Sequence, residues 1–408
     1  MRVLLVNKFH YIKGGSEKYY FELGKLLKEN GHEVAYFSME DDKNITTGGK
    51  EYFVKKSDMN SKNIFKALDV IYSRKNYTRM VEAIEDFKPD IIHLNNFQRQ
   101  LSASVVMAAY KKHIPMVFTA HDLQAICPAI TMLDSDNKVC EKCMHHKYMN
   151  CYKKKCIKNS RLKSLLGAIE NYYYNHKKIF TRKISHIITP SNFYRNKFIE
   201  EGINENKITC IHNFIDVDSY DIPTSDKGYI LYLGRLSKEK GIYNLIKAVE
   251  KSKEKNPDIK LFIVGDGPEK ENISRIAEMS GLKNNIKLLG FLNNEEVKKY
   301  VSECSFMVIP SIWYENGPYS VLEAQCIGKA IIGANIGGIP EFVKDNVCGL
   351  TYSYESAEEL SLKINELLAD KAKLKQYSKK AKEMAREEYN SKSYYDKIIK
   401  VYEKVINH

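Results

Sequence analysis

The chain has 408 residues, 43% of them hydrophobic, and carries a formal net charge of +13. This length predicts two or three domains, each able to bury a core. No apolar run approaches the roughly 20 residues of a membrane-spanning helix, and the first residues turn polar too soon for a signal peptide. We therefore expect a soluble cytoplasmic protein, in which the nine cysteines need not form disulfides.

In the first half of the chain, short apolar runs alternate with amphipathic segments. One amphipathic helix is predicted near residues 17–30, with Leu23, Leu26 and Leu27 on one face and Gly31 as its stop. Such alternation is typical of parallel sheets covered by helices. The predicted strands are 3–6, 33–37, 91–94, 116–119 and 186–189.

A second series of the same kind begins after a turn-rich stretch, 213–227, that lacks periodicity. The predicted domains are therefore 1–213 and 214–390, with a final helical segment, 391–408, expected to return to the N-terminal domain. The second series contains predicted strands 229–233, 261–264, 286–289, 306–309 and 330–332 and predicted helices 241–254, 269–281 and 294–303.

The predicted fold class is α/β, with two Rossmann-like, doubly wound parallel-sheet domains facing a central cleft. Open sheets of this kind bind ligands beyond the carboxyl ends of their strands. Candidate functional residues are therefore sought where polar residues follow a strand.

The excess positive charge is concentrated in residues 142–183, which hold twelve Lys and Arg and one acidic residue, Glu170. This stretch belongs to a predicted insertion at about 127–183 and also contains Tyr172, Tyr173 and Tyr174. A basic, aromatic surface suits anionic lipid headgroups, phosphates or nucleic acid. A solvated basic helix face is the alternative interpretation.

The same insertion contains a cluster of cysteines, in which Cys127 is followed by four more. Cys-x2-Cys with two further thiols nearby is a spacing of zinc ligands. Free thiols in a mobile loop, or redox pairs, are the alternatives. The predicted ligands of a structural zinc ion are Cys140, Cys143, Cys151 and Cys156.

Two glutamates, Glu315 and Glu323, flank a predicted helix start in the second half. Pro318 marks the first turn, so Glu315 lies in the strand-to-helix loop and Glu323 in the second helical turn. The free N–H groups at a helix start bind phosphate, and a neighbouring carboxylate can hold sugar or ribose hydroxyls. An isolated pair of this kind would more simply be two solvated glutamates.

A phosphate grip is predicted where Gly234 and Arg235 follow a strand and Lys240 precedes a helix. The guanidinium offers a planar fork to phosphate oxygens and the ammonium a point charge. Gly265 ends the next strand in a tight turn, and Phe291 follows another strand end where a base could bind.

Taken together, these motifs resemble the C-terminal half of glycosyltransferase family 4 enzymes, which have the two-domain GT-B architecture. Their order and spacing agree over about 110 residues, which makes the resemblance specific. The matching motifs are Gly234-Arg235, Lys240-Gly241, Gly265-Asp-Gly-Pro268, Gly290-Phe291, Glu315-x7-Glu323 and Gly337-Gly-x-Pro-Glu341.

The resemblance implies retaining transfer from a UDP- or GDP-sugar without a catalytic metal. It implies that Arg235 and Lys240 bind the diphosphate, that Glu315 contacts the donor sugar and that Glu323 contacts the ribose. The family's common aromatic–glycine pair after the first glutamate is replaced here, which leaves donor choice open. The donor-binding residues so implied are Gly14, Gly15, Gly234, Arg235, Lys240, Gly265, Phe291, Glu315, Asn316, Gly317, Pro318, Tyr319, Ser320 and Glu323.

The first half resembles the family more weakly. A loop containing Gly14 and Gly15 follows the first strand, and in the family this loop lies over the donor phosphates. His121, at the end of a strand, resembles the family's sugar-contacting histidine, although a lone histidine there is more often structural. The catalytic residues implied are His121, Glu315, Arg235 and Lys240.

The expected function is therefore that of a retaining hexosyltransferase in cell-surface polysaccharide or glycolipid synthesis. The expected acceptor is a lipid-linked saccharide on the inner face of the plasma membrane, where residues 142–183 would dock on anionic lipid. A GT-B epimerase or phosphorylase is an alternative that the motif order disfavours. A nucleic-acid-binding protein using the cysteine cluster and the basic stretch is another, and it would leave Glu315 and Glu323 idle.

Overall fold

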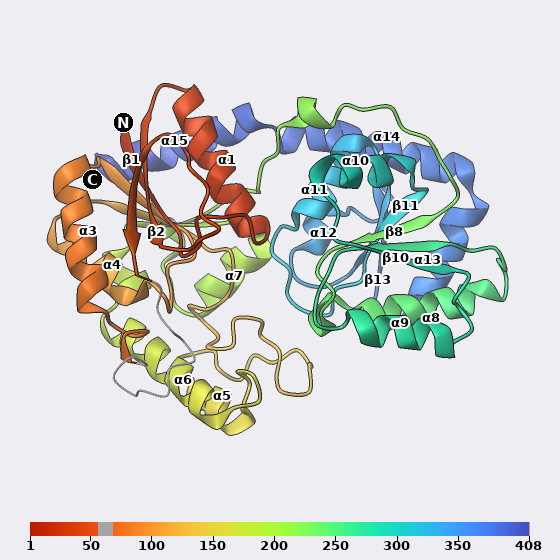
Figure 1. Ribbon diagram of the computed structural model, residues 1–408, viewed down its shortest axis with the longest axis horizontal. Helices are drawn as coiled ribbons and strands as arrows, with labels where there is room; N and C mark the ends of the chain where they lie inside the picture. The colour runs from red at the N-terminus through yellow and green to blue at the C-terminus, as the bar shows by residue number, and fades with distance from the viewer. Residues whose placement is uncertain (56–67, 408) are drawn as a thin grey trace. The chain divides into compact units, whose positions relative to one another are not determined.

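The computed structural model describes residues 1–55 and 68–407, and these form two compact units (Figure 1). Unit 1 comprises Met1–His212 and Tyr394–His408, and unit 2 comprises Asn213–Ser393. The chain therefore leaves unit 1, builds unit 2 and returns to unit 1.

In unit 1 the described strands form a seven-stranded parallel sheet in the order β3-β2-β1-β4-β5-β6-β7. Val3 of β1 pairs with Val34 on one side and with Ile91 on the other, and all three are buried. Burial on both faces explains the continuous apolar runs of the central strands. The strands are β1 (Arg2–Val6), β2 (Glu33–Met39), β3 (Lys50–Val54), β4 (Ile91–Leu94), β5 (Met116–Thr119), β6 (His186–Thr189) and β7 (Ile208–Cys210).

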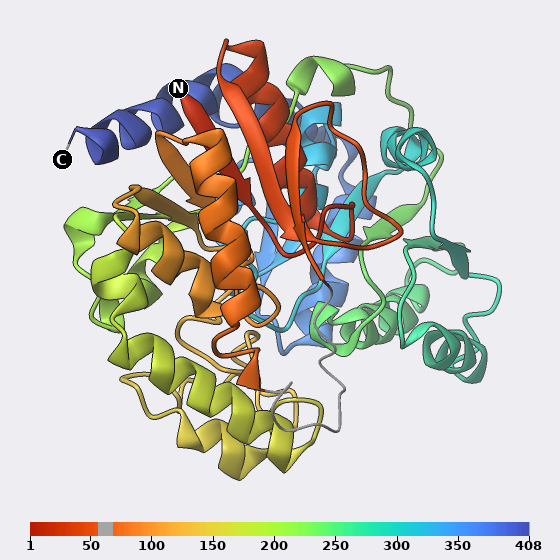
Figure 2. The same ribbon diagram turned by 60° about the vertical axis from the view of Figure 1, so that its left-hand side comes forward.

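The last helix of the chain, α15, packs on unit 1. The Tyr402 hydroxyl lies 2.5 Å from Nδ1 of the buried His93, and the Tyr394 hydroxyl bonds that of Tyr19. Both views show this helix beside the N-terminal strand (Figures 1 and 2). The α-helices described in unit 1 are α1 (Gly15–Glu29), α3 (Arg74–Phe87), α4 (Ser102–Lys111), α5 (Met149–Lys154), α6 (Arg161–His176), α7 (Asn192–Glu200) and α15 (Ser391–Ile406).

Unit 2 repeats the design with a six-stranded parallel sheet in the order β10-β9-β8-β11-β12-β13. Its strands are β8 (Ile230–Leu233), β9 (Leu261–Val264), β10 (Ile286–Gly290), β11 (Phe306–Ile309), β12 (Ile331–Ala334) and β13 (Gly349–Tyr352). Its α-helices are α8 (Ile242–Lys253), α9 (Lys270–Met279), α10 (Asn294–Glu303), α11 (Tyr319–Ile327), α12 (Ile339–Phe342), α13 (Ala357–Ala369) and α14 (Lys371–Glu388).

The strand order of each sheet reverses at one point, between β1 and β4 in unit 1 and between β8 and β11 in unit 2. Loops that leave the carboxyl ends of two such strands diverge, and the crevice between them is where open α/β sheets bind ligands. The predicted α/β class with two parallel sheets is confirmed. Within the described ranges, no helix is long and apolar enough to cross a bilayer.

Candidate functional site

At the switch point of unit 2, the loops after β8 and β11 bring Lys240 and Glu315 together. Lys240 Nζ lies 2.6 Å from Glu315 Oε1, and the Ser311 hydroxyl donates to the same oxygen at 2.7 Å. Only 7% of the Glu315 side chain is exposed. Burial alone would raise the pKa of Glu315, but Lys240 and the hydrogen bonds hold this pKa below its usual value. The two residues therefore form an ion pair that is mostly shielded from solvent.

Two glycines allow the loops of this pair to approach each other. Gly241 has φ of +69°, and a Cβ there would lie 1.7 Å from the Pro310 carbonyl oxygen. Gly337 has φ of +60°, and a Cβ there would lie 2.7 Å from the backbone nitrogen and oxygen of Glu315. Gly338 N–H donates to the Glu315 carbonyl at 2.7 Å. The backbone of Glu315 is thus held by close contacts that leave no room for a side chain at position 337.

The helix after Glu315 is α11, which begins at Tyr319, one residue after Pro318. The backbone before it is held by Asn213, whose side-chain amide donates to the Gly317 carbonyl at 2.8 Å. Glu323 lies in the second turn, as predicted, and accepts a hydrogen bond of 3.3 Å from the Tyr220 hydroxyl. The start of α11 and Glu315 are therefore adjacent, with Glu323 one turn further along.

The glycine loops after β8, β9 and β10 are joined by backbone hydrogen bonds. Gly234 N–H donates to Val264 O at 3.1 Å, and Gly265 N–H donates to Gly290 O at 2.8 Å. Two side chains stand out from this edge: Phe291, which is 81% exposed, and Arg235, which is also exposed. Within the described chain the Arg235 guanidinium makes no hydrogen bond or ion pair, so it is available to an anionic ligand.

Trp313, the single tryptophan of the chain, lies beside this site, and the motifs did not select it. Lys240 Nζ lies 5.1 Å from its ring centroid, a cation–π distance. The sequence signal that could have found Trp313 is its place between a strand end and Glu315.

At the switch point of unit 1, His121 follows β5 and is held by Asn95, which follows β4. His121 Nε2 lies 2.9 Å from Asn95 Oδ1, and the Asn95 amide faces Val6 O at 3.4 Å. This orientation of the amide assigns the proton to Nε2 and leaves Nδ1 with a lone pair. Burial, together with Lys8, lowers the pKa of His121 to about 3. His121 is thus a neutral imidazole.

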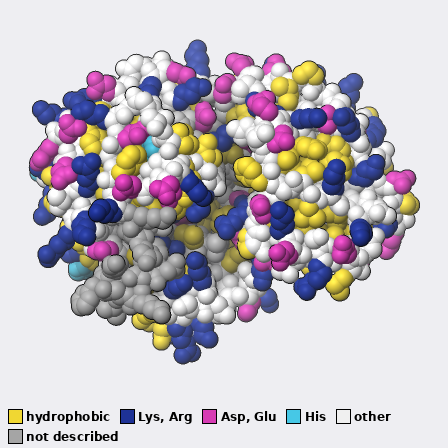
Figure 3. Space-filling model, viewed as in Figure 1, with side chains coloured by type: hydrophobic (Ala, Val, Ile, Leu, Met, Phe, Trp, Pro, Cys, Tyr) yellow, Lys and Arg dark blue, Asp and Glu magenta, His cyan; other side chains and the backbone are white. Residues whose placement is uncertain are grey.

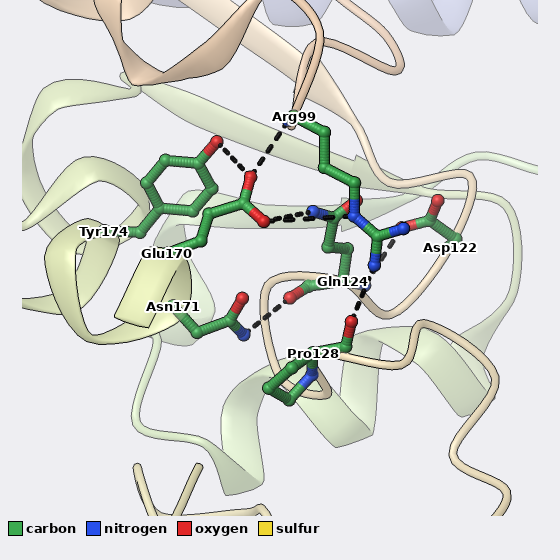
Figure 4. A network of polar contacts seen from close by, with 7 residues as sticks. All are labelled: Arg99, Asp122, Gln124, Pro128, Glu170, Asn171 and Tyr174. Carbon is green, nitrogen blue, oxygen red and sulfur yellow. Dashed lines mark hydrogen bonds and ion pairs between the residues drawn. The ribbon is translucent and has the colours of Figure 1, made fainter. Parts of the chain in front are cut away.

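A polar network joins the loop after β5, through Gln124, to α6 (Figure 4). Glu170 of α6 accepts hydrogen bonds from the Arg99 N–H at 2.9 Å, the Tyr174 hydroxyl at 2.9 Å and the Gln124 amide at 3.2 Å. Arg99 also donates to the Pro128 carbonyl at 2.8 Å. Burial raises the pKa of Glu170, and Arg99 opposes that shift. The single acid of the basic stretch therefore ties α6 to the strand-end loops.

Lys8, two residues after β1, adds a cation to this edge. Burial lowers its pKa, while the nearby carboxylate of Asp122 acts in the opposite direction. Its ammonium makes no hydrogen bond or ion pair with any residue that the structure describes. The start of α1, where Gly14 and Gly15 lie, is joined to the same edge because the Asn96 amide donates to Ser16 Oγ at 2.9 Å. Sequence reasoning missed Lys8, Arg99 and Glu170, each of which resembles any other charged residue.

The basic stretch forms α5 and α6, which project from the sheet of unit 1 (Figure 2). Apolar side chains are exposed among its lysines: Leu162 is 73% exposed, Ile169 43% and Tyr172 38%. In the space-filling view, Lys and Arg side chains gather at the lower edge, over these helices (Figure 3). Tyr174 is buried, so the expectation that it joins this surface is wrong, because its hydroxyl donates to the buried Glu170.

The predicted zinc ligands do not lie together as a group of four. Among the described residues, no three of Cys140, Cys143, Cys151 and Cys156 have their sulfur atoms within 4.8 Å of one another.

Comparison with known proteins adds family-level information to this geometry. Residues 13–219 match the family model described as Glycosyltransferase Family 4, and residues 219–384 match the model described as Glycosyl transferases group 1. An uncharacterized glycosyltransferase of Methanocaldococcus jannaschii is 27% identical over 58% of this chain and 63% of its own length. A 42.6 kDa protein of the cps region of Klebsiella pneumoniae is 24% identical over 84% of this chain and 87% of its own length.

An amylovoran biosynthesis glycosyltransferase of Erwinia amylovora is 26% identical over 43% of this chain. The chain spans less than two thirds of the M. jannaschii relative and 46% of the E. amylovora one. Among solved structures, a Rickettsia africae glycosyltransferase superposes with a TM-score of 0.72 at 19% identity, covering 99% of this chain and 98% of that one. An Anabaena protein solved with UDP and glucose superposes with a TM-score of 0.71 at 17% identity, covering 99% and 100%. At these identities the likeness shows the fold.

Proposed function

The chain belongs to glycosyltransferase family 4 and has the GT-B fold, and on this premise we propose that it transfers a sugar from a nucleotide-sugar donor to a saccharide acceptor with retention of configuration. The observation that carries the proposal is the pairing of Lys240 with Glu315 at the switch point of unit 2, next to the start of α11. A cation and a helix start bind diphosphate, and a fixed carboxylate next to them binds sugar hydroxyls.

We assign the parts of the donor to residues of unit 2. The diphosphate binds Arg235, Lys240 and the backbone of Asn316–Ser320, and Glu323 holds the ribose. Phe291, exposed beside Gly290, stacks on the base. When the donor binds, the Lys240 ammonium pairs with the phosphate in place of Glu315. The Glu315 carboxylate is then free to accept hydrogen bonds from the sugar hydroxyls.

The proposed reaction is a front-face displacement. The bond between the anomeric carbon and the phosphate oxygen breaks, the bond to the acceptor oxygen forms on the same face, and the acceptor proton passes to the departing phosphate. Arg235 and Lys240 stabilise the charge on that phosphate, and no metal is needed for this. We assign the neutral His121 to the donor sugar and the Gly14–Gly15 loop to the phosphates.

The donor is tested by titrating nucleoside diphosphates while the fluorescence of Trp313 is followed, since this is the only tryptophan and lies 5.1 Å from Lys240 Nζ. We expect UDP or GDP to change the signal, and Trp313→Phe to abolish it while leaving binding measured by calorimetry. Proton NMR of the glycoside made from the active sugar nucleotide then reports its anomeric configuration. Inversion, or absence of binding by any nucleoside diphosphate, would contradict the proposal.

For the acceptor we propose a lipid-linked saccharide, reached by docking of α5 and α6 on the anionic inner face of the plasma membrane. Lys153, Lys155 and Lys158 are exposed, and the same basic stretch exposes apolar side chains that include Leu162, which is 73% exposed. Each basic residue near an anionic leaflet adds about 1 kcal/mol, so a few suffice for reversible binding. The names of the Klebsiella and Erwinia relatives support a role in cell-surface polysaccharide synthesis.

Sedimentation with liposomes tests this docking. Binding should require anionic lipid, weaken with added salt, and fall when Lys153, Lys155 and Lys158 become glutamate. The matched control changes three exposed lysines of unit 2, Lys255, Lys260 and Lys375, to glutamate and should bind almost as the wild type does. Equal losses in the two triple variants would show that net charge, not this surface, drives binding.

A further inference from the structure

The loop between β1 and α1, residues 7–14, carries aromatic rings and lysines at the carboxyl edge of the unit 1 sheet. The ring centroids of Phe9 and Tyr11 lie 5.4 Å apart, and both side chains are partly exposed. Ile12, the next residue, is 60% exposed. The loop therefore leaves aromatic and aliphatic surface accessible at the edge where parallel α/β sheets bind ligands.

His10 anchors this loop to the core of unit 1. Its side chain is fully buried, whereas those of its neighbours Phe9 and Tyr11 are not. His10 Nδ1 lies 3.1 Å from the Tyr20 hydroxyl, and the His10 carbonyl accepts a hydrogen bond of 2.8 Å from Ile45 N–H in the loop after β2. Rings held on an anchored loop lose little conformational freedom when a ligand binds, which favours binding.

Three lysines pack against the two rings. Lys8 Nζ lies 5.8 Å and Lys13 Nζ 4.2 Å from the ring centroid of Phe9. Lys43 Nζ lies 5.9 Å from the ring centroid of Tyr11. All three distances are within the range of cation–π contacts, roughly 6 Å. None of these ammonium groups forms a hydrogen bond or an ion pair with a residue in the described ranges, so their charges are available to an anion.

Lys8 is the least exposed of the three lysines, being half-buried where Lys13 and Lys43 are exposed. Its backbone N–H donates to the Asn96 carbonyl at 2.8 Å, so it lies where the loops after β1 and β4 meet, at the switch point of the sheet. An ammonium group that is partly removed from water and lacks a partner is destabilising until an anion pairs with it. Lys8 therefore indicates an anionic ligand at this edge.

Aromatic rings next to cations suit a sugar that carries a negative charge. Sugar rings have apolar C–H faces that pack on aromatic side chains, and carboxylate or phosphate oxygens accept charge-assisted hydrogen bonds from ammonium groups. The donor does not account for these lysines, because the proposed donor site in unit 2 has cations of its own, Arg235 and Lys240. The acceptor is the substrate that remains.

We propose that the acceptor is an acidic saccharide, whose carboxylate or phosphate pairs with Lys8 and Lys13 and whose sugar ring packs on Tyr11. Lysine side chains are long and flexible, so the two ammonium groups that contact the Phe9 ring can turn to one anion. This inference rests on the proposed function, and it names the chemical class of acceptor that the function leaves open.

Binding of small sugars to the full-length protein tests the proposal. NMR titrations, with nucleoside diphosphate present in excess, compare methyl glucuronide, glucose 6-phosphate and methyl glucoside. We expect at least one acidic sugar to bind about tenfold more tightly than the neutral one, and the preferred acid identifies the charged group. Equal affinities for all three sugars would overturn the proposal. Binding of the nucleoside diphosphate, measured separately, reports on the proposed donor site alone.

Four variants locate the anion. Lys8→Met and Lys13→Met should each lose most of the preference for the acid, and the exposed position of Lys13 makes its variant safe for folding. The matched control, Lys111→Met, removes an exposed lysine that packs on the Tyr77 ring of the same unit at 5.8 Å, and should keep the preference. Arg235→Ala should also keep it. Equal losses in Lys13→Met and Lys111→Met, or a loss in Arg235→Ala, would overturn the proposal.

Discussion

The two units place charge at the same topological position by different means. In unit 2, glycine-bearing loops bring one lysine and one glutamate into direct contact, with 2.6 Å between Lys240 Nζ and Glu315 Oε1. In unit 1, Glu170 reaches the strand ends from a distant helix and accepts three hydrogen bonds, while Arg99 Nε stays 3.9 Å from its carboxylate. Glu315 in unit 2 is thus held mainly by one cation, whereas Glu170 in unit 1 is held by several hydrogen bonds.

This difference bears on what each site can do. A carboxylate held by one lysine and one serine can exchange the lysine for a ligand, as the proposed donor binding requires. A carboxylate held by a backbone N–H, a tyrosine and an amide has no partner that is free to leave. We therefore regard Glu315 as a ligand-binding group and Glu170 as a positioning group for the loop that carries Arg99.

The largest expected effect comes from removing the single strong partner. Lys240→Ala leaves the buried Glu315 carboxylate without its cation, which should cost about 3–5 kcal/mol of stability in unit 2 at neutral pH. Without Lys240, burial raises the pKa of Glu315, so the loss should shrink on acidification as Glu315 takes up a proton. Urea unfolding followed by Trp313 fluorescence measures it.

Two variants sharpen this result. Adding Glu315→Gln to Lys240→Ala should recover much of the stability, since the charge is gone. In unit 1, Arg99→Asn should cost less than Lys240→Ala, because Glu170 keeps its other hydrogen bonds and asparagine tolerates the positive φ of 65° at this position. Hydrogen exchange resolved by unit compares them, and an equal or larger loss from Arg99→Asn would contradict the distinction between the units.

A smaller effect is expected where a side chain has no partner before the ligand arrives. Arg235→Ala should leave stability unchanged but weaken nucleoside diphosphate binding by about 1.5–3 kcal/mol, the range for a charge-assisted hydrogen bond. Lys238→Ala, which removes another exposed cation from the same loop, is the control and should bind nearly as the wild type does. Calorimetric titration with the nucleotide decides between them, and equal weakening would assign the effect to net charge.

The smallest expected effect is the pH dependence of stability, which should differ between the two units because of their histidines. Burial lowers the pKa of His93 and of His121 to about 3, and residues 213–393 contain no histidine. The unfolded chain binds these protons below about pH 6.5, so unit 1 should lose up to about 1.4 kcal/mol per pH unit for each group as the pH falls. His93→Gln should reduce the dependence of stability on pH in unit 1 and leave that of unit 2 unchanged. Hydrogen exchange at several pH values measures this dependence for each unit. An equal dependence in both units would contradict the prediction.

How far the sequence predicts the structure also differs between regions. The predicted strands 91–94, 116–119, 186–189, 261–264 and 306–309 agree with the structure at both ends, because buried strands of parallel sheets are continuous apolar runs. The strands not predicted, β3, β7 and β13, all lie at sheet edges. Edge strands are short and carry polar residues, as Lys50 and Glu51 do in β3, which removes the signal.

The candidate sites follow the same rule. In unit 2 the glycines and charges act within a few residues of one another, so their spacing is visible in the sequence. In unit 1, Lys8, Arg99 and Glu170 lie close together only because three segments far apart in the sequence pack together. No local sequence pattern predicts that packing.

Because α15 returns to unit 1, part of that unit is synthesised only after the whole of unit 2. Tyr394 and Tyr402, which bond Tyr19 and His93, are translated roughly 200 residues after unit 1 leaves for unit 2. At about 5–20 residues per second, the ribosome needs on the order of 10–40 s to supply them. During that interval Tyr19 and His93 of the nascent chain lack the hydrogen bonds that α15 later supplies. Unit 1 therefore acquires the contacts of α15 only after that helix has been made.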